Sequence, residues 1–295
     1  MNEADLSLTG SDGMSIRGYR WSGEGAPKAI INLAHGMGEH AARYRRFAQA
    51  LVHDGYVVYA NDHRGHGRTA AGAERGTDGH GDLGPAGWRG LVDDLGTLNQ
   101  LAREEHPDTP LVMFGHSMGS FALQQFLIER SSETDAAILS GTSAIDVIGA
   151  GIDPDAEVDL SAFNEPFEPA PTEYEWLSRD RAEVDAYVAD DACGFGIDAA
   201  AARSMLEGTS AAGDPAKIAQ VRSDLPIYLM SGDADPLAGG GELIELVAQR
   251  YRNAGVADVT VARYPDARHE LMNETNRDAV TADVLAWLDQ TVAGL

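Results

Sequence analysis

The chain has 295 residues, of which 43% are hydrophobic and 23% are charged. These fractions are close to globular averages, so they exclude a fibrous or disordered protein, and the length allows one large α/β domain or two ordinary ones. The 22 basic and 47 acidic residues give a net charge of −25, which repels phosphate groups, and we therefore expect no nucleic-acid partner.

The first half of the chain alternates strand patterns with helix patterns. Two short alternating segments flank Gly10 and Gly13 and predict a hairpin, Leu6–Thr9 and Met14–Trp21. The buried strand patterns that follow are Lys28–Ala34, Tyr56–Ala60, Leu111–Phe114 and Ala136–Leu139. The helix patterns between them are Ala41–His53, Pro85–Glu105 with Pro85 in its first turn, and Met118–Arg130. This alternation predicts a parallel sheet with helices on both faces.

The alternation stops between about Ser143 and Pro215, where no buried strand pattern occurs. Capping residues in this stretch predict three helix starts, at Thr172 with Glu175, at Asp180 with Glu183, and at Asp198 with an end at Gly208. The pattern then resumes with two strands and two helices, Pro226–Met230, Glu242–Arg252, Val259–Tyr264 and Thr275–Leu288. We therefore predict a core of residues 1–142 and 216–295, interrupted by a helical cap at residues 143–215.

The single cysteine, Cys193, excludes an intrachain disulfide, as is usual in a reducing cytoplasm. The acidic, polar N-terminus lacks the features of a signal peptide. No apolar run reaches the roughly 18 residues that a membrane span requires. We expect a cytoplasmic protein without an integral membrane segment, and the sequence carries no signal for its oligomeric state.

The segment Gly115-His116-Ser117-Met118-Gly119 is a G-x-S-x-G pattern. It follows a strand pattern directly and opens a helix pattern, which is the strand–turn–helix context that a nucleophilic serine requires. Glycines allow the backbones of such a tight turn to approach closely. The pattern predicts that Ser117 is a nucleophile presented above the edge of the sheet.

A serine hydroxyl needs a general base, and in this class of fold the chain order is Ser, then Asp or Glu, then His. Of nine histidines only His269 follows Ser117, so it is the predicted base. The acid should lie in the loop after the strand Pro226–Met230, where Asp233 and Asp235 both qualify. The residues alone leave these two open.

The oxyanion that forms during acyl transfer needs two backbone donors. One should be the N–H of Met118, which follows the nucleophile, and the other should come from the Gly-rich turn after the strand Lys28–Ala34, where we choose Met37. His63 and His66 have no Cys, Asp or Glu cluster at ligand spacing, so we expect no metal. Instead, we expect Asp62, Arg64 and His66 to form a hydrogen-bonded turn that supports the site.

Five motifs, HGMGEHAARYRRFAQAL, NDHRGHGRT, GHSMG, GDADPL and ARHELMNE, together resemble the bacterial-type monoacylglycerol lipase and lysophospholipase branch of the α/β hydrolases. The resemblance covers nearly the whole chain. It implies an α/β-hydrolase fold, with a mostly parallel eight-stranded sheet flanked by helices and a helical cap. It also implies ester hydrolysis through an acyl-enzyme without a cofactor, and it favours Asp235 over Asp233 as the acid.

In this branch the cap encloses an acyl chain, and the apolar cap residues that could line such a tunnel here are Phe163, Phe167, Tyr174, Trp176, Leu177 and Phe195. The leading hypothesis is a serine carboxylic ester hydrolase that cleaves small-molecule or lipid esters of the monoacylglycerol or lysophospholipid type. A short-chain esterase or thioesterase is the alternative. A proline iminopeptidase-like amidase or a non-catalytic binding protein is less favoured.

Overall fold

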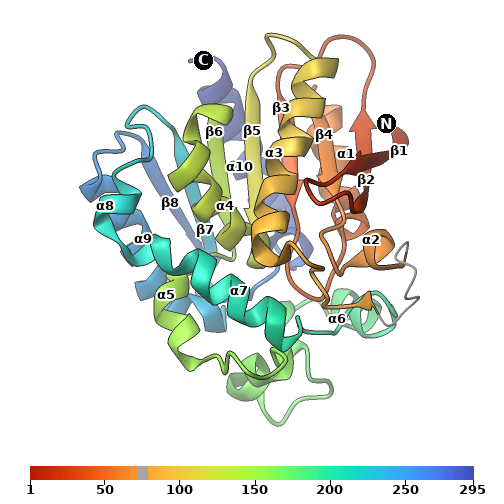
Figure 1. Cartoon of the computed structure of the whole chain (residues 1–295), viewed down its shortest axis with the longest axis vertical. Helices are drawn as coiled ribbons and strands as arrows, with labels where there is room; N and C mark the ends of the chain where they lie inside the picture. The colour runs from red at the N-terminus through yellow and green to blue at the C-terminus, as the bar shows by residue number, and fades with distance from the viewer. Residues whose placement is uncertain (72–78) are drawn as a thin grey trace.

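A mostly parallel sheet of eight strands runs through the protein, in the order β1-β2-β4-β3-β5-β6-β7-β8 (Figure 1). The structure is a computed structural model and describes residues 1–71 and 79–295. The strands are β1 Asn2–Thr9, β2 Ser15–Ser22, β3 Ile30–Ala34, β4 Val57–Asn61, β5 Leu111–His116, β6 Ala136–Ser140, β7 Ile227–Gly232 and β8 Val259–Tyr264. The hairpin β1–β2 and the pair β2–β4 are antiparallel, and all other pairs are parallel. The predicted α/β-hydrolase architecture is confirmed.

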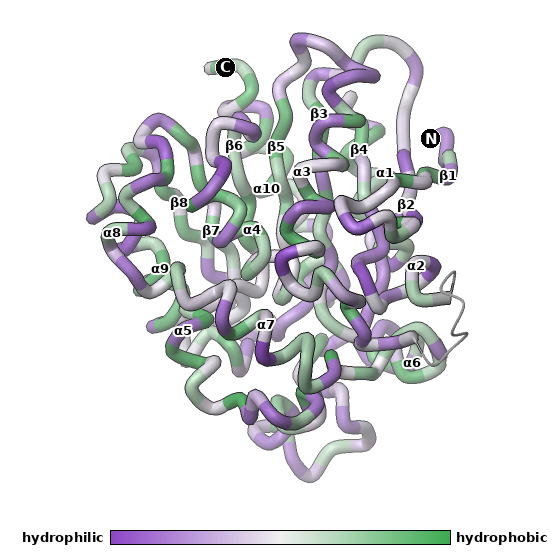
Figure 2. The backbone as a smooth tube through the Cα atoms, viewed as in Figure 1, coloured by the Kyte–Doolittle hydropathy of each residue, from purple (hydrophilic) through white to green (hydrophobic). Residues whose placement is uncertain are grey.

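Helices cover both faces of this sheet. On one face lie α1 (Arg45–His53) and α10 (Arg277–Val292), and on the other α3 (Gly87–Glu105), α4 (Met118–Arg130) and α9 (Glu242–Asn253) (Figure 1). Their apolar side chains form two separate buried clusters, one against each face. Figure 2 shows mostly hydrophobic residues along the central strands and more hydrophilic residues along the outer helices and loops. Strands that are covered on both faces are apolar throughout.

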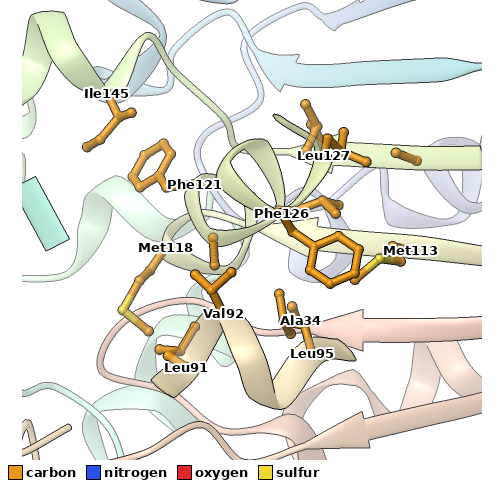
Figure 3. Close-up of a cluster of buried hydrophobic side chains, with 14 of the residues drawn as sticks. Ala34, Leu91, Val92, Leu95, Met113, Met118, Phe121, Phe126, Leu127 and Ile145 are labelled. Carbon is orange, nitrogen blue, oxygen red and sulfur yellow. The ribbon is translucent and has the colours of Figure 1, made fainter. Parts of the chain in front are cut away.

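The helix α4 is the most deeply buried of these helices. All its residues from Met118 to Ile128 are buried, since it packs between the sheet and the helices α3 and α7 (Ala199–Thr209). Figure 3 shows Met118 and Phe121 on the same side of α4, with Phe121 beside Ile145. The start of α4 is therefore fixed by packing in every direction.

Short helical segments fill the chain between β6 and β7, and residues 143–215 contain no strand. Most of them lie together at one end of the sheet, whereas α8 (Pro215–Ile218) lies beside it (Figure 1). The α-helices are α5 Ile145–Ile148, α6 Arg181–Val188, α7 and α8, and the 3-10 turns are η4 Gly149–Gly151, η5 Leu160–Phe167, η6 Glu175–Leu177 and η7 Ser210–Gly213. Other helical elements in the described part of the chain are α2 Gly67–Ala71, η1 Ala41–Tyr44, η3 Ser131–Glu133, η8 Pro236–Gly241 and η9 Leu271–Asn273.

Two expectations about helix starts are wrong. Pro85 lies before α3 and not in its first turn, because the N–H of Gly87 bonds to the carbonyl of Gly84 in a separate turn (2.9 Å). Thr172 starts no α-helix. Only the three-residue turn η6 follows it, and the carbonyls of that turn bond to another part of the chain, as described below.

Two other predicted helix starts are confirmed. Asp180 accepts a hydrogen bond from the N–H of Ala182 and caps α6, and Asp198 accepts one from Ala201 and caps α7. The Glu183 side chain does not complete a capping box, because it bonds to Arg46. Among the described residues, no helix is both long and apolar enough to cross a membrane.

Candidate active site

Ser117 lies in the sharp turn between β5 and α4, with φ = 50° and ψ = −121°. This left-handed conformation is costly for a residue with a side chain, and it persists only where the surroundings enforce it. Gly119 provides part of that enforcement, because a Cβ there would lie 2.4 Å from the carbonyl oxygen of Ala34. The N–H of Ser117 donates to the carbonyl of Ser140 on β6 (2.9 Å), which anchors the turn to the sheet.

His269 and Asp235 lie in the loops that follow the two neighbouring strands β8 and β7. The Nδ1 atom of His269 is 2.9 Å from Oδ2 of Asp235, and the two residues are 1% and 2% exposed. The loops approach so closely that a Cβ on Gly232 would lie 2.0 Å from the carbonyl oxygen of Ala267. A glycine at the end of β7 is therefore required to bring the carboxylate to the imidazole.

The side chain of Asp233 does not contact His269 and pairs with Arg263 instead. Its side chain is partly exposed and accepts a hydrogen bond from Nε of Arg263 (2.7 Å). Asp235 instead uses Oδ1 to cap η8 through the N–H of Leu237 (2.9 Å), which leaves Oδ2 for His269. Of the two candidate acids, the structure brings only Asp235 to the histidine.

The imidazole of His269 is enclosed by rings. Its centroid lies 4.8 Å from the ring of Trp176 and 4.7 Å from that of His116. Burial alone would lower the pKa of His269, but the charge and hydrogen bond of Asp235 raise it above its ordinary value. Burial and the neighbouring His269 hold the pKa of His116 well below its ordinary value, so His116 stays neutral.

The turn after β3 brings Gly36 and Met37 beside Ser117. A Cβ on Gly36 would lie 3.2 Å from the Cβ of Ser117. Within residues 1–71 and 79–295, the backbone N–H groups of Met37 and Met118 donate to no protein acceptor. The two N–H groups that were predicted to bind an oxyanion are thus available on either side of Ser117.

A buried ion-pair network joins this turn to the histidine loop. Glu39 accepts hydrogen bonds from the N–H of Gly36 (2.6 Å) and from Nη1 of Arg43 (2.8 Å). Arg43 also pairs with both carboxylate oxygens of Glu270, the neighbour of His269. The charge of Arg43 holds the pKa of Glu270 below its ordinary value despite burial. The network fixes the two loops relative to each other.

An apolar cavity opens beside Ser117 and His269, and a mostly hydrophobic lining is typical of sites that bind small molecules. Residues of both the core and the segment 143–215 line it. Its apolar lining includes Phe121, Leu237, Ile145, Ile148, Ile152, Val158, Leu160 and Met205. A cavity of this composition favours a hydrocarbon chain over a polar ligand.

Of the six apolar residues of segment 143–215 that were predicted to line a tunnel, three line this cavity, namely Phe163, Trp176 and Leu177. Phe167 does not, because its ring lies under the guanidinium of Arg268 (4.4 Å). Tyr174 and Phe195 also lie outside the lining. The hydroxyl of Tyr174 donates to the carbonyl of Gly194 (2.8 Å), and Phe195 stacks on His80.

The turn η6 is hydrogen-bonded to the histidine loop through backbone groups. His269 donates its N–H to the carbonyl of Trp176 (3.3 Å), and Glu270 donates to Leu177 (2.8 Å). The fully buried carboxylate of Glu274 reinforces this contact. It accepts from the N–H groups of Arg179 (3.0 Å) and Arg268 (2.9 Å), one on each side of the junction.

The described residues contain one group with metal-ligand spacing, formed by His40, Asp190 and Cys193. His40 and Asp190 already pair with each other (3.0 Å), and burial raises the pKa of the Cys193 thiol, which keeps it protonated. A protonated thiol is a poor metal ligand. His63 and His66 lie fully buried against the ring of His35. The backbone N–H of His63 donates to Nε2 of His35 (2.9 Å).

Sequence reasoning did not identify Glu39, Arg43, Glu270 or Glu274 as parts of the site. The spacing of Glu39 and Arg43, four residues apart, is a signal for an ion pair on a helical turn. Nothing in the sequence connects them to Glu270, because that contact spans 227 residues.

A family model described as serine aminopeptidase, S33 matches residues 25–276. A monoacylglycerol lipase of Mycolicibacterium smegmatis is 32% identical over 97% of this chain and 96% of its own length. A monoglyceride lipase of Rattus norvegicus is 26% identical over 97% and 90%. A solved carboxyl esterase from Bacillus coagulans, in complex with glycerol, superimposes with a TM-score of 0.87 at 27% identity and covers 99% of both chains.

Proposed function

The chain belongs to the serine aminopeptidase S33 family, in the monoacylglycerol lipase branch of the α/β hydrolases, and we propose that it cleaves monoacylglycerols with Ser117, His269 and Asp235 as its catalytic triad. It is a carboxylic ester hydrolase. The observation that carries the triad is the buried contact of 2.9 Å between His269 and Asp235 at the mouth of a cavity that Ser117 also lines.

In the proposed reaction, Oγ of Ser117 attacks the carbonyl carbon of the ester while Nε2 of His269 takes the hydroxyl proton. The N–H groups of Met37 and Met118 bind the oxyanion of the tetrahedral intermediate. The intermediate collapses when His269 returns the proton to the leaving alcohol, and an acyl-enzyme remains. Water then attacks the acyl-enzyme by the same route and releases the fatty acid.

The lining of the cavity supports an acyl chain as the group that it encloses. Residues 143–215, which we propose act as a cap, contribute most of the apolar side chains at the wall. The relatives named above as lipases of monoacylglycerols, and the esterase that binds glycerol, support a glycerol ester as the substrate.

The test is hydrolysis of a chain-length series of monoacylglycerols beside short soluble esters, their thioester counterparts and a triacylglycerol, with Ser117→Ala as the blank. We expect the highest kcat/KM for monoacylglycerols of medium or long chain, and a loss on the order of 10⁴-fold or more in the blank. Preference for short esters or thioesters would replace the proposal with the general esterase alternative. Activity on prolyl amides alone would indicate an iminopeptidase, and no Ser117-dependent turnover would indicate a binding protein.

We also propose that the chain acts in the cytoplasm and binds no nucleic acid. One cysteine and a net charge of −25 support this. Cell fractionation and a gel-shift assay at low salt test the two statements, and recovery in a membrane or secreted fraction or a shifted band would contradict them.

A further inference from the structure

The polar side chains that line the cavity are almost all satisfied by the protein itself. Glu39 and Glu270 both pair with Arg43. The hydroxyl of Tyr187 donates to the carbonyl of Gly38 (2.8 Å). His116 contacts the hydroxyl of Ser140 (3.3 Å), and His269 pairs with Asp235. These groups have little capacity left for a ligand.

Trp176 is different. Its side chain lines the cavity and is 3% exposed, yet its indole Nε1 is buried with no hydrogen-bond acceptor among the residues that the structure describes. A buried N–H without a partner is costly, because the donor gives up its hydrogen bonds to water. A phenylalanine would fill much of the same space without that cost. The N–H of Trp176 therefore needs an acceptor that the described residues do not supply.

The position of the indole is fixed. The backbone N–H of Trp176 donates to Oδ1 of Asn164 (3.1 Å), and its carbonyl accepts from the N–H of His269 (3.3 Å). The ring centroid lies 5.1 Å from that of Phe163 and 4.8 Å from that of His269. The indole ring is therefore held beside the proposed general base.

We propose that the indole N–H of Trp176 donates a hydrogen bond to a hydroxyl oxygen in the alcohol part of the bound ester, which makes Trp176 a specificity residue for polyol esters. This inference rests on the proposed function. In that reaction the carbonyl oxygen faces Met37 and Met118, and the ester oxygen receives its proton from His269. The acyl chain carries no acceptor. Only the free hydroxyls remain, and the leaving alcohol must lie close to His269 and hence to Trp176.

The test compares monodecanoylglycerol with propyl decanoate, which has the same acyl chain but no free hydroxyl. Trp176→Phe removes the N–H and keeps an aromatic ring against His269. We expect the ratio of the two kcat/KM values, glycerol ester over propyl ester, to fall roughly 3- to 10-fold, as the loss of one neutral hydrogen bond predicts. An unchanged ratio in Trp176→Phe would overturn the inference, even if both activities fell together.

Trp88→Phe is the matched control, because its Nε1 already donates to Gln125 (2.7 Å) and its ring lies outside the cavity. The ratio should stay the same in that variant, and an equal fall there would also overturn the inference. Failure of the proposed function gives a different result, since the wild-type protein would then show no Ser117-dependent cleavage of monodecanoylglycerol. In that case the inference fails with it.

Discussion

The core and the cap hold their parts of the site by different means. Ser117, Asp235 and His269 follow directly or closely on the ends of β5, β7 and β8 in one sheet, so the hydrogen bonds of the sheet set their relative positions. The proposed cap, residues 143–215, has no helix longer than 11 residues and depends on individual contacts with the core. The difference suggests that the chemistry is robust to changes in the cap away from η6, whereas the choice of substrate is sensitive to them.

The largest expected effect tests the core. Asp235→Asn should lower kcat by about 10³- to 10⁴-fold, because an amide cannot hold His269 in the required tautomer or stabilise its positive charge. Asp233→Asn is the matched control and should change kcat less than threefold. Steady-state kinetics of the two variants decides between the acids, and the opposite ranking would move the acid to Asp233.

The pH dependence tests the same contact. His269 must be neutral to accept a proton from Ser117, and Asp235 raises its pKa above the ordinary value. Activity should therefore rise with pH, with kcat/KM falling about tenfold for each pH unit below the raised pKa. In Asp235→Asn the acidic limb should move to lower pH. A wild-type limb centred below the ordinary pKa of histidine would contradict this assignment.

A smaller effect is expected where the cap joins the core. Glu274→Gln weakens the charge-assisted hydrogen bonds to Arg179 and Arg268, so we expect a loss of about 2 kcal/mol in the free energy of unfolding. We also expect kcat to fall several-fold, because the same carboxylate holds the histidine loop. Denaturant unfolding and kinetics measure both, with the exposed Glu165→Gln as control. An unaltered kcat would show that this junction does not position His269.

The smallest effect concerns the wall of the cavity. Phe163→Ala should lower kcat/KM for long-chain monoacylglycerols about fivefold and leave short esters less affected, since Phe163 lines the cavity. Phe167→Ala is the matched control because its ring packs on Arg268 instead. Equal effects of the two variants on the chain-length profile would mean that both act through the stability of the cap.

The sequence predicted the core better than the cap for a physical reason. Buried strands show as continuous apolar runs, and β8 was predicted to the residue at Val259–Tyr264. Chain order and strand ends were also enough to select Ser117 and His269 as candidates. The cap has no such period, because its 3-10 turns are stabilised by distant partners. Trp176 meets His269 across 93 residues, and no local pattern encodes that contact.

The sequence pattern by itself also could not decide whether Asp233 or Asp235 is the acid. Both are carboxylates in the same loop, and what separates them is the direction of the backbone. That direction depends on the close approach of Gly232 to Ala267. The resemblance to known hydrolases favoured Asp235, and the geometry of the two loops supports the same residue.

The backbone bonds between η6 and the histidine loop bear on how such a protein can diversify. A chimera that exchanged all of residues 143–215 would also replace Trp176 and Leu177, whose carbonyls accept from His269 and Glu270. A graft that retains residues 174–179 would leave the surroundings of the imidazole intact. The remainder of the cap could then be recombined between homologues, so new substrate ranges could arise without rebuilding the catalytic machinery.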